Sequence, residues 1–276
     1  MELLKSHKCF SGQVEIWQHA SQETKTPMTF SIFRPSQTGP RPMLIWLSGL
    51  TCTHENFFHK AGAFETAGRL GMILVAPDTS PRNTGIVGED ADWQFGSGAG
   101  FYVDATQKPW NNHYRMFSYI SRELRGLLVE QFDADNDRVS LSGHSMGGHG
   151  ALVMGLREPE RYRSISALAP ICAPTSSPLG QKAFAGYLQP GEGKHWDACE
   201  LAKGKKSWTL PDILIDQGTE DEFYLEGKLQ PERFREACSA GGIGLKLRFQ
   251  KGFDHSYYFV ASFIQEHLEF SQRCLD

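Results

Sequence analysis

Short apolar segments alternate with helical patterns along most of the chain, and this alternation is the feature that most restricts how the chain can fold. Most of these segments have the length of a strand and are compact and apolar, which is typical of strands buried on both faces. They are residues 43–48, 72–76, 138–142, 165–169, 213–217 and 245–250. The helical patterns cover residues 61–70, 114–131, 146–156, 231–240 and 259–270. Strands that alternate with helices form βαβ units, so we predict an α/β fold with a mostly parallel central sheet and helices on both faces.

Two segments near the N-terminus have a different pattern. Residues 14–18 and 28–34 alternate between apolar and polar side chains. The alternation is regular enough to indicate an antiparallel pair of strands. The sequence therefore predicts an antiparallel pair of N-terminal strands beside the parallel sheet.

Two long segments interrupt the alternation. Residues 78–112 are rich in glycine, aspartate and aromatic side chains, and residues 170–206 are rich in proline, glycine, serine and tryptophan. Loops of this length are usually functional or contain small elements of their own. Each follows a predicted strand, at the edge of the sheet where α/β proteins bind ligands. We expect a single domain spanning residues 1–276, in which these two insertions form a pocket.

Composition and charge exclude several classes of protein. Of the 276 residues, 40% are hydrophobic and 22% are charged, which excludes a disordered or fibrous chain. The net charge of -4 provides no attraction to nucleic acid or to an anionic membrane. The apolar runs are too short for a membrane helix, and polar residues 5–8 interrupt the apolar stretch that a signal peptide would need. The six cysteines are scattered with no C-x-x-C pair, which favours reduced thiols over a disulfide framework. We therefore expect a cytoplasmic protein that binds neither nucleic acid nor membrane.

The strongest chemical signal is Gly143-His144-Ser145-Met146-Gly147, which matches the G-x-S-x-G pattern of a nucleophile elbow. The pattern alone is common, but here it lies between a predicted strand and a predicted helix. A serine on such a sharp turn projects its hydroxyl group out of the sheet, and the two glycines leave room for the turn. The sequence predicts Ser145 as a nucleophile.

A nucleophilic serine needs a histidine base, which should follow it in the chain. Three histidines lie well past Ser145: His195, His255 and His267. His195 is inside the second insertion and His267 is inside the last predicted helix. His255 follows the last predicted strand, where the base of this arrangement is expected, and is our candidate.

The base needs a carboxylate that orients it and stabilises its positive charge. Glu220, Asp221 and Glu222 all follow the penultimate strand, and the pattern alone does not choose among them. Asp216 lies within the strand, and Asp254 is adjacent to His255. Both positions are less suitable for a carboxylate that must face the imidazole.

An acyl-transfer site also needs backbone N–H groups that stabilise an oxyanion. The residue after the nucleophile, Met146, provides one of them. The loop after the strand at residues 43–48 provides the other, with Leu50 as our candidate and Gly49 and Thr51 as alternatives.

Several stretches resemble the S-formylglutathione hydrolases, also called the esterase D family, within the α/β-hydrolase superfamily. The matching stretches are residues 47–52, 77–82, 98–102, 142–150, 215–218 and 254–259. GHSMGGHGA and DHSYYF are specific to that family rather than to hydrolases in general. The resemblance implies an α/β-hydrolase fold and a serine thioesterase that converts S-formylglutathione to glutathione and formate in formaldehyde removal. It also implies activity on short-chain esters.

The same resemblance implies the roles of individual residues. The nucleophile maps to Ser145, the acid to Asp221, the base to His255 and the oxyanion donors to Leu50 and Met146. It implies no metal and no organic cofactor, and family members are often homodimers. The alternative function is that of a general short-chain carboxylesterase, for which glutathione thioesters are incidental substrates. A catalytically inactive hydrolase fold used for binding is a third hypothesis, against which the intact set of Ser145, Asp221 and His255 argues.

Other side chains near these motifs have two interpretations each. Cys52 follows the oxyanion loop closely, and we expect a packing residue near the site rather than a nucleophile. His144 and His149 flank Ser145, and we expect packing rather than metal binding because no third ligand is evident. Aromatic residues of the insertions either form walls of an acyl pocket or pack the long loops together. They are Trp93, Phe95, Phe101, Trp110 and Trp196.

Overall fold

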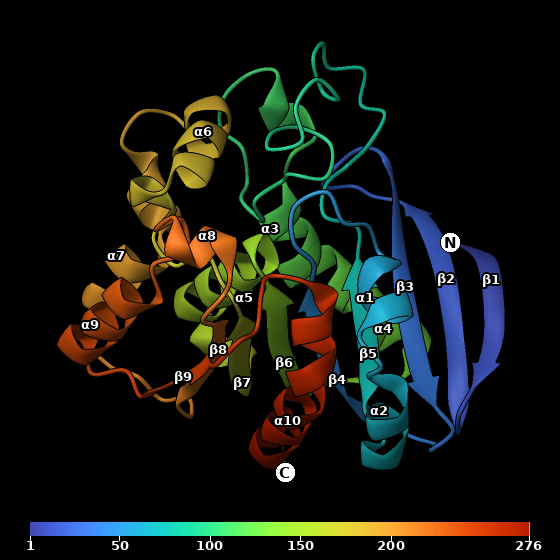
Figure 1. The fold of residues 1–276 in the computed structure, drawn as a ribbon. Coiled ribbons are helices and arrows are strands. Elements are labelled where there is room, and N and C mark those ends of the chain that lie inside the picture. Colours follow the sequence, from blue (N-terminus) through green and yellow to red (C-terminus); the bar gives the residue numbers. More distant parts are fainter. Residues whose placement is uncertain (276) are drawn as a thin grey trace.

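The computed structural model describes residues 1–275, which contain a nine-stranded sheet in the order β1-β2-β3-β5-β4-β6-β7-β8-β9 (Figure 1). The strands are β1 (Glu2–Cys9), β2 (Gly12–Ala20), β3 (Pro27–Pro35), β4 (Arg41–Leu47), β5 (Ile73–Pro77), β6 (Ala134–His144), β7 (Ser164–Leu168), β8 (Ile213–Gly218) and β9 (Leu245–Gln250). All pairs from β5 through β4 to β9 are parallel, and β1, β2 and β3 are antiparallel to their neighbours. The predicted mostly parallel sheet with antiparallel N-terminal strands is therefore confirmed.

The N-terminal strand β1 was not among the predicted strands. It pairs with β2 at the edge of the sheet, and nearly all of its side chains are exposed. An edge strand with both faces in solvent has no apolar alternation, so its sequence carries no strand signal.

Helices cover the two faces of the sheet. They are α1 (Asn56–Lys60), α2 (Phe64–Leu70), α3 (Met116–Ser118), α4 (Arg125–Phe132), α5 (Met146–Arg157), α6 (Pro178–Tyr187), α7 (Ala198–Lys203), α8 (Glu222–Leu225), α9 (Pro231–Gly241) and α10 (Tyr257–Leu275). A π-helical stretch at Tyr119–Leu124 joins α3 to α4. Figure 1 shows α10 and α2 in front of the sheet and α5 behind it. The core lies between these layers, where β4 and β5 are buried along their whole length.

One predicted helix begins later than expected, and a short helix before it was not predicted. The helix predicted at residues 61–70 is α2, which begins at Phe64, and α1 ends at Lys60, just before the predicted range. Gly62 between them has φ 68°, a left-handed conformation that glycine adopts easily and that ends a helix.

The parallel strands place several loops at one edge of the sheet. The segments that follow β4, β6, β8 and β9 contain Leu50, Ser145, Asp221 and His255 respectively. The two insertions also begin at this edge, after β5 and β7, and lie above it in Figure 1. The second insertion forms α6 and α7, whereas the first contains few regular elements.

Within residues 1–275, no helix is both long enough and apolar enough to span a membrane.

Candidate active site

Ser145 lies at the sharp turn between β6 and α5, with φ 58° and ψ -120°. A left-handed φ is unfavourable for a residue with a Cβ, so neighbouring contacts must hold it. The Ser145 N–H donates to Leu168 O (3.0 Å), and Ser145 O accepts from the His149 N–H (3.0 Å). This strained and well-held backbone is the geometry of a nucleophile elbow.

Two glycines make the turn sterically feasible. A Cβ on Gly143 would lie 2.3 Å from Gly147 O, and a Cβ on Gly147 would lie 1.9 Å from Leu47 O. Neither position tolerates a side chain, because α5 begins in direct contact with β4 and β6. The pattern G-x-S-x-G therefore reflects close packing on both sides of Ser145.

Ser145 and His255 line one cavity of about 260 Å³. Its lining residues are Gly49, Leu50, Thr51, Cys52, Trp93, His144, Ser145, Leu179, Phe223, His255, Ser256 and Tyr257. They come from the loops after β4, β6, β8 and β9 and from both insertions. The structure thus brings together at one cavity segments that are far apart in the sequence.

Asp221 is fully buried and contacts His255, with 2.6 Å between Asp221 Oδ2 and His255 Nδ1. The other carboxylate oxygen, Oδ1, accepts from the backbone N–H groups of Phe223 (2.9 Å) and Tyr224 (3.2 Å), so Asp221 caps α8. Gln217 Nε2 donates to Oδ2 (3.1 Å). A carboxylate only accepts hydrogen bonds, so this contact places the imidazole proton on Nδ1 and leaves Nε2 as the basic nitrogen.

The other carboxylates considered from the sequence lie elsewhere. Glu220, Glu222 and Asp254 are exposed, and Asp254 accepts from Ser256. Asp216 is buried and is bound by Arg248, Gln250 and His267.

Asp216 belongs to a separate ionic cluster of the core. Burial acts to raise the pKa of Asp216, but hydrogen bonds from His267 and Arg248 outweigh it and hold the pKa at about 2. Asp216 is therefore a charged structural residue, and His267 is its partner.

Aromatic rings enclose the His255 imidazole. The ring of His144 lies 4.5 Å from it and the ring of Phe223 lies 4.6 Å from it, measured between centroids. Burial lowers the pKa of His144 well below its usual value, and the nearby His255 lowers it further, so His144 is a neutral neighbour. Within residues 1–275, Ser145 Oγ and His255 Nε2 are not hydrogen-bonded to each other, although both side chains line the cavity. Such contacts often tighten only when substrate is bound.

The loop after β4 lies directly against Ser145. A Cβ on Gly49 would be 3.2 Å from Ser145 Cβ. The Thr51 N–H donates to Gly98 O (2.9 Å), so it is not free to bind a ligand, which leaves Leu50 and Gly49 as candidate donors in this loop. Met146 is the first residue of α5, and its N–H has no partner within the helix.

The aromatic residues of the insertions mostly pack with one another rather than line this cavity. Trp93 lines the cavity. Phe95 and Trp110 contact each other and Tyr187, which joins the two insertions. Phe101 is buried against His149. For most of these residues the second interpretation, loop packing, is the one that the structure supports.

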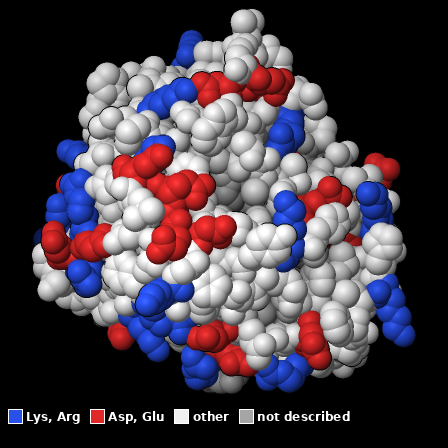
Figure 2. Space-filling model, in the orientation of Figure 1, with Lys and Arg blue, Asp and Glu red and all other residues white. Residues whose placement is uncertain are grey.

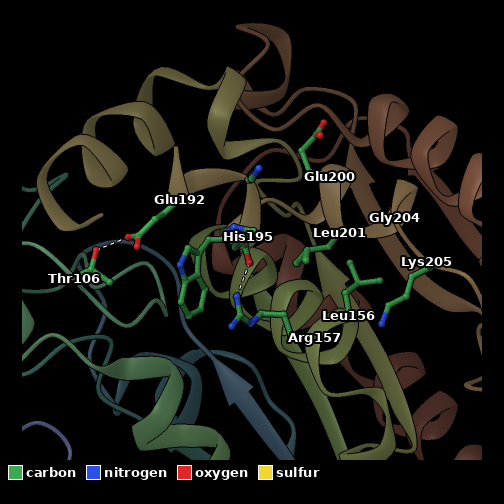
Figure 3. A pocket seen from close by; sticks show the side chains of 11 residues that line it. Thr106, Leu156, Arg157, Glu192, His195, Glu200, Leu201, Gly204 and Lys205 are labelled. Atoms are coloured by element: carbon green, nitrogen blue, oxygen red, sulfur yellow. Dashed lines mark hydrogen bonds between the residues drawn. The ribbon is translucent and has the colours of Figure 1, made fainter. Parts of the chain in front are cut away.

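Trp196 lines a different cavity, which has a volume of about 710 Å³ (Figure 3). There the Arg157 guanidinium lies 4.1 Å from the Trp196 ring centroid and donates to His195 O (2.7 Å). This cavity is at the C-terminal end of α5, whereas Ser145 is at its N-terminal end. His195, one of the three candidate histidines, is therefore remote from Ser145.

His149 points into the packing behind the elbow. It is fully buried, its Nε2 lies 3.0 Å from Phe101 O, and burial lowers its pKa to about 4. Within the described part of the chain, no group of three or more His, Cys, Asp or Glu residues is arranged to hold a metal ion.

Three residues that shape the site have roles that cannot be recognised from the sequence. Gln217 fixes the Asp221 carboxylate, and Phe223 and Tyr257 line the cavity. All three lie within a few residues of the predicted acid or base. Proximity to those positions was the available signal, but it does not reveal the direction of a side chain.

Comparison with known proteins agrees with this geometry. Residues 21–270 match the family model described as "Putative esterase". The S-formylglutathione hydrolase of Rattus norvegicus is 49% identical over the full length of both chains. That of Mus musculus is 47% identical over all of this chain and 99% of its own. A solved S-formylglutathione hydrolase from Agrobacterium tumefaciens superposes with a TM-score of 0.96 at 42% identity and full coverage of both chains. These matches confirm the resemblance and the α/β-hydrolase fold, and the chain belongs to the S-formylglutathione hydrolase family of esterases.

Proposed function

We propose that this protein hydrolyses S-formylglutathione to glutathione and formate, with Ser145, His255 and Asp221 as its catalytic triad and Leu50 and Met146 as oxyanion donors. The observation that carries the proposal is the buried Asp221–His255 pair, which opens onto the same cavity as the strained Ser145. Family membership supports the choice of substrate.

The proposed reaction has two stages. Ser145 Oγ attacks the formyl carbon while His255 Nε2 accepts the hydroxyl proton, and Asp221 stabilises the resulting imidazolium. The N–H groups of Leu50 and Met146 bind the oxyanion. The C–S bond then breaks, and the sulfur of glutathione leaves with the proton from His255. Water next attacks the formyl-enzyme, His255 accepts a proton from it and returns one to Ser145, and formate is released. This sequence of steps requires no cofactor.

The direct test is a comparison of kcat/KM for S-formylglutathione with kcat/KM for short p-nitrophenyl esters. A value for S-formylglutathione well above those for the esters supports the proposal. A value at or below those for the esters favours a general short-chain carboxylesterase, the second candidate, which uses the same triad.

Acyl size provides a second test of the two candidates. Trp93 and Leu179 wall a cavity of only about 260 Å³. Along the glutathione thioesters formyl, acetyl, propionyl and butyryl, we expect kcat/KM to fall by about 10-fold or more per methylene forced against these walls. A general esterase would gain from each added apolar contact. A flat or rising series would overturn the preference for formyl.

Cys52 allows a further prediction, because its side chain lines the cavity without a part in the reaction. Burial raises the pKa of the Cys52 thiol, and the charge of Lys60 acts in the opposite direction. We expect N-ethylmaleimide to inhibit by placing a bulky group beside the oxyanion loop. The Cys52→Ala variant should remain active and become resistant, and Cys9→Ala is the control that should stay sensitive. A Cys52→Ala variant as inactive as Ser145→Ala would contradict this account.

We further propose that residues 1–276 form a single domain with the insertions 78–112 and 170–206 as parts of its pocket. Trp93 and Leu179, one from each insertion, support this. A cytoplasmic location is supported by the six free cysteines, which suit a reducing compartment. A homodimer is proposed on family resemblance alone.

A further inference from the structure

One cation lies beside the mouth of the active-site cavity without a carboxylate partner. Lys60 is the last residue of α1, and its Nζ lies 5.6 Å from the centroid of the Tyr257 ring. Tyr257 lines the cavity, as does Cys52, whose thiol is influenced by the Lys60 charge. Within residues 1–275, Lys60 forms no ion pair, and its side chain is exposed. Its positive charge is therefore available to a ligand that enters the cavity.

Three other cations near this cavity are paired with carboxylates. Lys228 lies 5.3 Å from the Phe223 ring centroid and is paired with Glu226. Lys182 pairs with Asp92, next to Trp93. Arg82 binds Asp78 through two nitrogens and donates to Cys52 O. Lys60 and Lys228 each lie over an aromatic side chain that lines the cavity. They differ in that the charge of Lys228 is neutralised by Glu226, whereas Lys60 has no such carboxylate partner within residues 1–275.

The opposite edge of the cavity is acidic. Glu222 and Asp254 are exposed there, and no ion pair engages them within the part of the chain that the structure describes. Asp254 binds Ser256 and Glu222 precedes Phe223, and both Ser256 and Phe223 line the cavity. Figure 2 shows acidic atoms gathered over α8 on one side of the central hollow and basic atoms over α1 on the other. A carboxylate that approaches the cavity is repelled from the first side and attracted to the second.

We propose that the Lys60 ammonium group binds a carboxylate of the thiol half of the substrate and so selects thioesters of an acidic, peptide-like thiol. The inference rests on the proposed function and deepens it. With the formyl carbon at Ser145, the thiol half must lie across the mouth of the cavity. The nearer terminal carboxylate of glutathione lies about two residues of chain from the sulfur, roughly 7 Å when extended, which allows it to reach the rim.

The test compares two formyl thioesters, one with carboxylates in its thiol half and one without, and follows how their ratio of kcat/KM changes between wild type and variant. One is S-formylglutathione and the other is the formyl thioester of N-acetylcysteamine, which is uncharged. In Lys60→Met, which keeps the apolar stem over Tyr257, we expect the ratio of the two kcat/KM values to fall about 5-fold against wild type, mainly through KM for S-formylglutathione. Lys60→Arg should restore the ratio, and the matched control Lys228→Met should leave it as in wild type. Added salt should lower the ratio in wild type and hardly change it in Lys60→Met.

The outcomes separate this inference from the proposed function. An unchanged ratio in Lys60→Met, or an equal loss on both thioesters, overturns the role of Lys60 while the proposed function stands. If wild type does not turn over S-formylglutathione, the proposed function fails. The role of Lys60 can then still be tested with S-methylglutathione as an inhibitor. Its inhibition constant is measured with p-nitrophenyl acetate as the substrate. About 5-fold weaker inhibition of Lys60→Met supports the inference, whereas equal inhibition, or none in wild type, overturns it.

Discussion

Replacement of Ser145 by alanine is expected to lower the turnover of both thioesters and esters by about 10⁴-fold or more. The substitution removes the hydroxyl group and leaves the Cβ, so the left-handed backbone at φ 58° is no more strained than before. The hydrogen bonds that hold the turn involve only the backbone of Ser145 and are kept. The loss therefore reports the chemistry of Oγ. Steady-state turnover of S-formylglutathione and p-nitrophenyl acetate by the purified variant measures it.

Two controls make this result interpretable. Circular dichroism and thermal unfolding of Ser145→Ala should match the wild type. Ser262→Ala removes an exposed hydroxyl group on α10, which donates only to Tyr258 O, and should retain full turnover. Near-normal activity in folded Ser145→Ala would show that another residue attacks the substrate.

The parallel part of the fold could be predicted because its strands are buried on both faces. Strands such as β4 and β5 are then uniformly apolar, and that signal does not depend on knowing their neighbours. The edge strand β1 has no such signal, since its stability comes from pairing with β2 rather than from burial. The predicted helix at residues 61–70 begins only at Phe64, and Gly62 was the available signal, but a glycine at the start of an apolar pattern does not show by itself where the helix begins.

Some residues of the candidate site could likewise be predicted from the sequence, and others could not. Ser145 and His255 could be placed from chain order and strand ends alone. The choice among Glu220, Asp221 and Glu222 could not be made from the pattern, because three successive residues after a strand point in different directions. The family resemblance implied Asp221, and the structure shows that its side chain is the one that turns inward to His255. Asp221 does so because it caps α8, a position that favours aspartate.

The walls of the cavity were the least predictable part of the site. Phe95 and Trp110 belong to the first insertion, and their partner Tyr187 belongs to the second. Contacts between two long irregular segments have no periodicity in the sequence. The aromatic content therefore predicted that side chains of the insertions are buried. It did not predict whether they face the substrate or the other insertion.

Replacement of Asp221 by asparagine is expected to lower kcat by about 10⁴-fold while the protein stays folded. An asparagine oxygen can still accept from the Phe223 and Tyr224 N–H groups and cap α8. Its amide group, if it faces His255, donates to Nδ1 and forces the proton onto Nε2, where the base must accept one from Ser145. Turnover of p-nitrophenyl acetate measures the loss, and thermal unfolding should be close to that of wild type.

Asp216→Asn is the matched control, because Asp216 is equally buried and also bound to a histidine, but lies outside the cavity. Its loss removes the carboxylate that binds the buried His267 and one of the two carboxylates that bind Arg248 within residues 1–275, so we expect the free energy of unfolding to fall by about 3 kcal/mol in urea titrations. The folded fraction should keep its turnover. If activity were lost in Asp216→Asn and retained in Asp221→Asn, Asp216 would be the carboxylate that orients the base and Asp221 would be the structural one. The predicted pattern separates an aspartate that orients a base from one that stabilises the core, although both lie at the end of the same strand and bind a histidine.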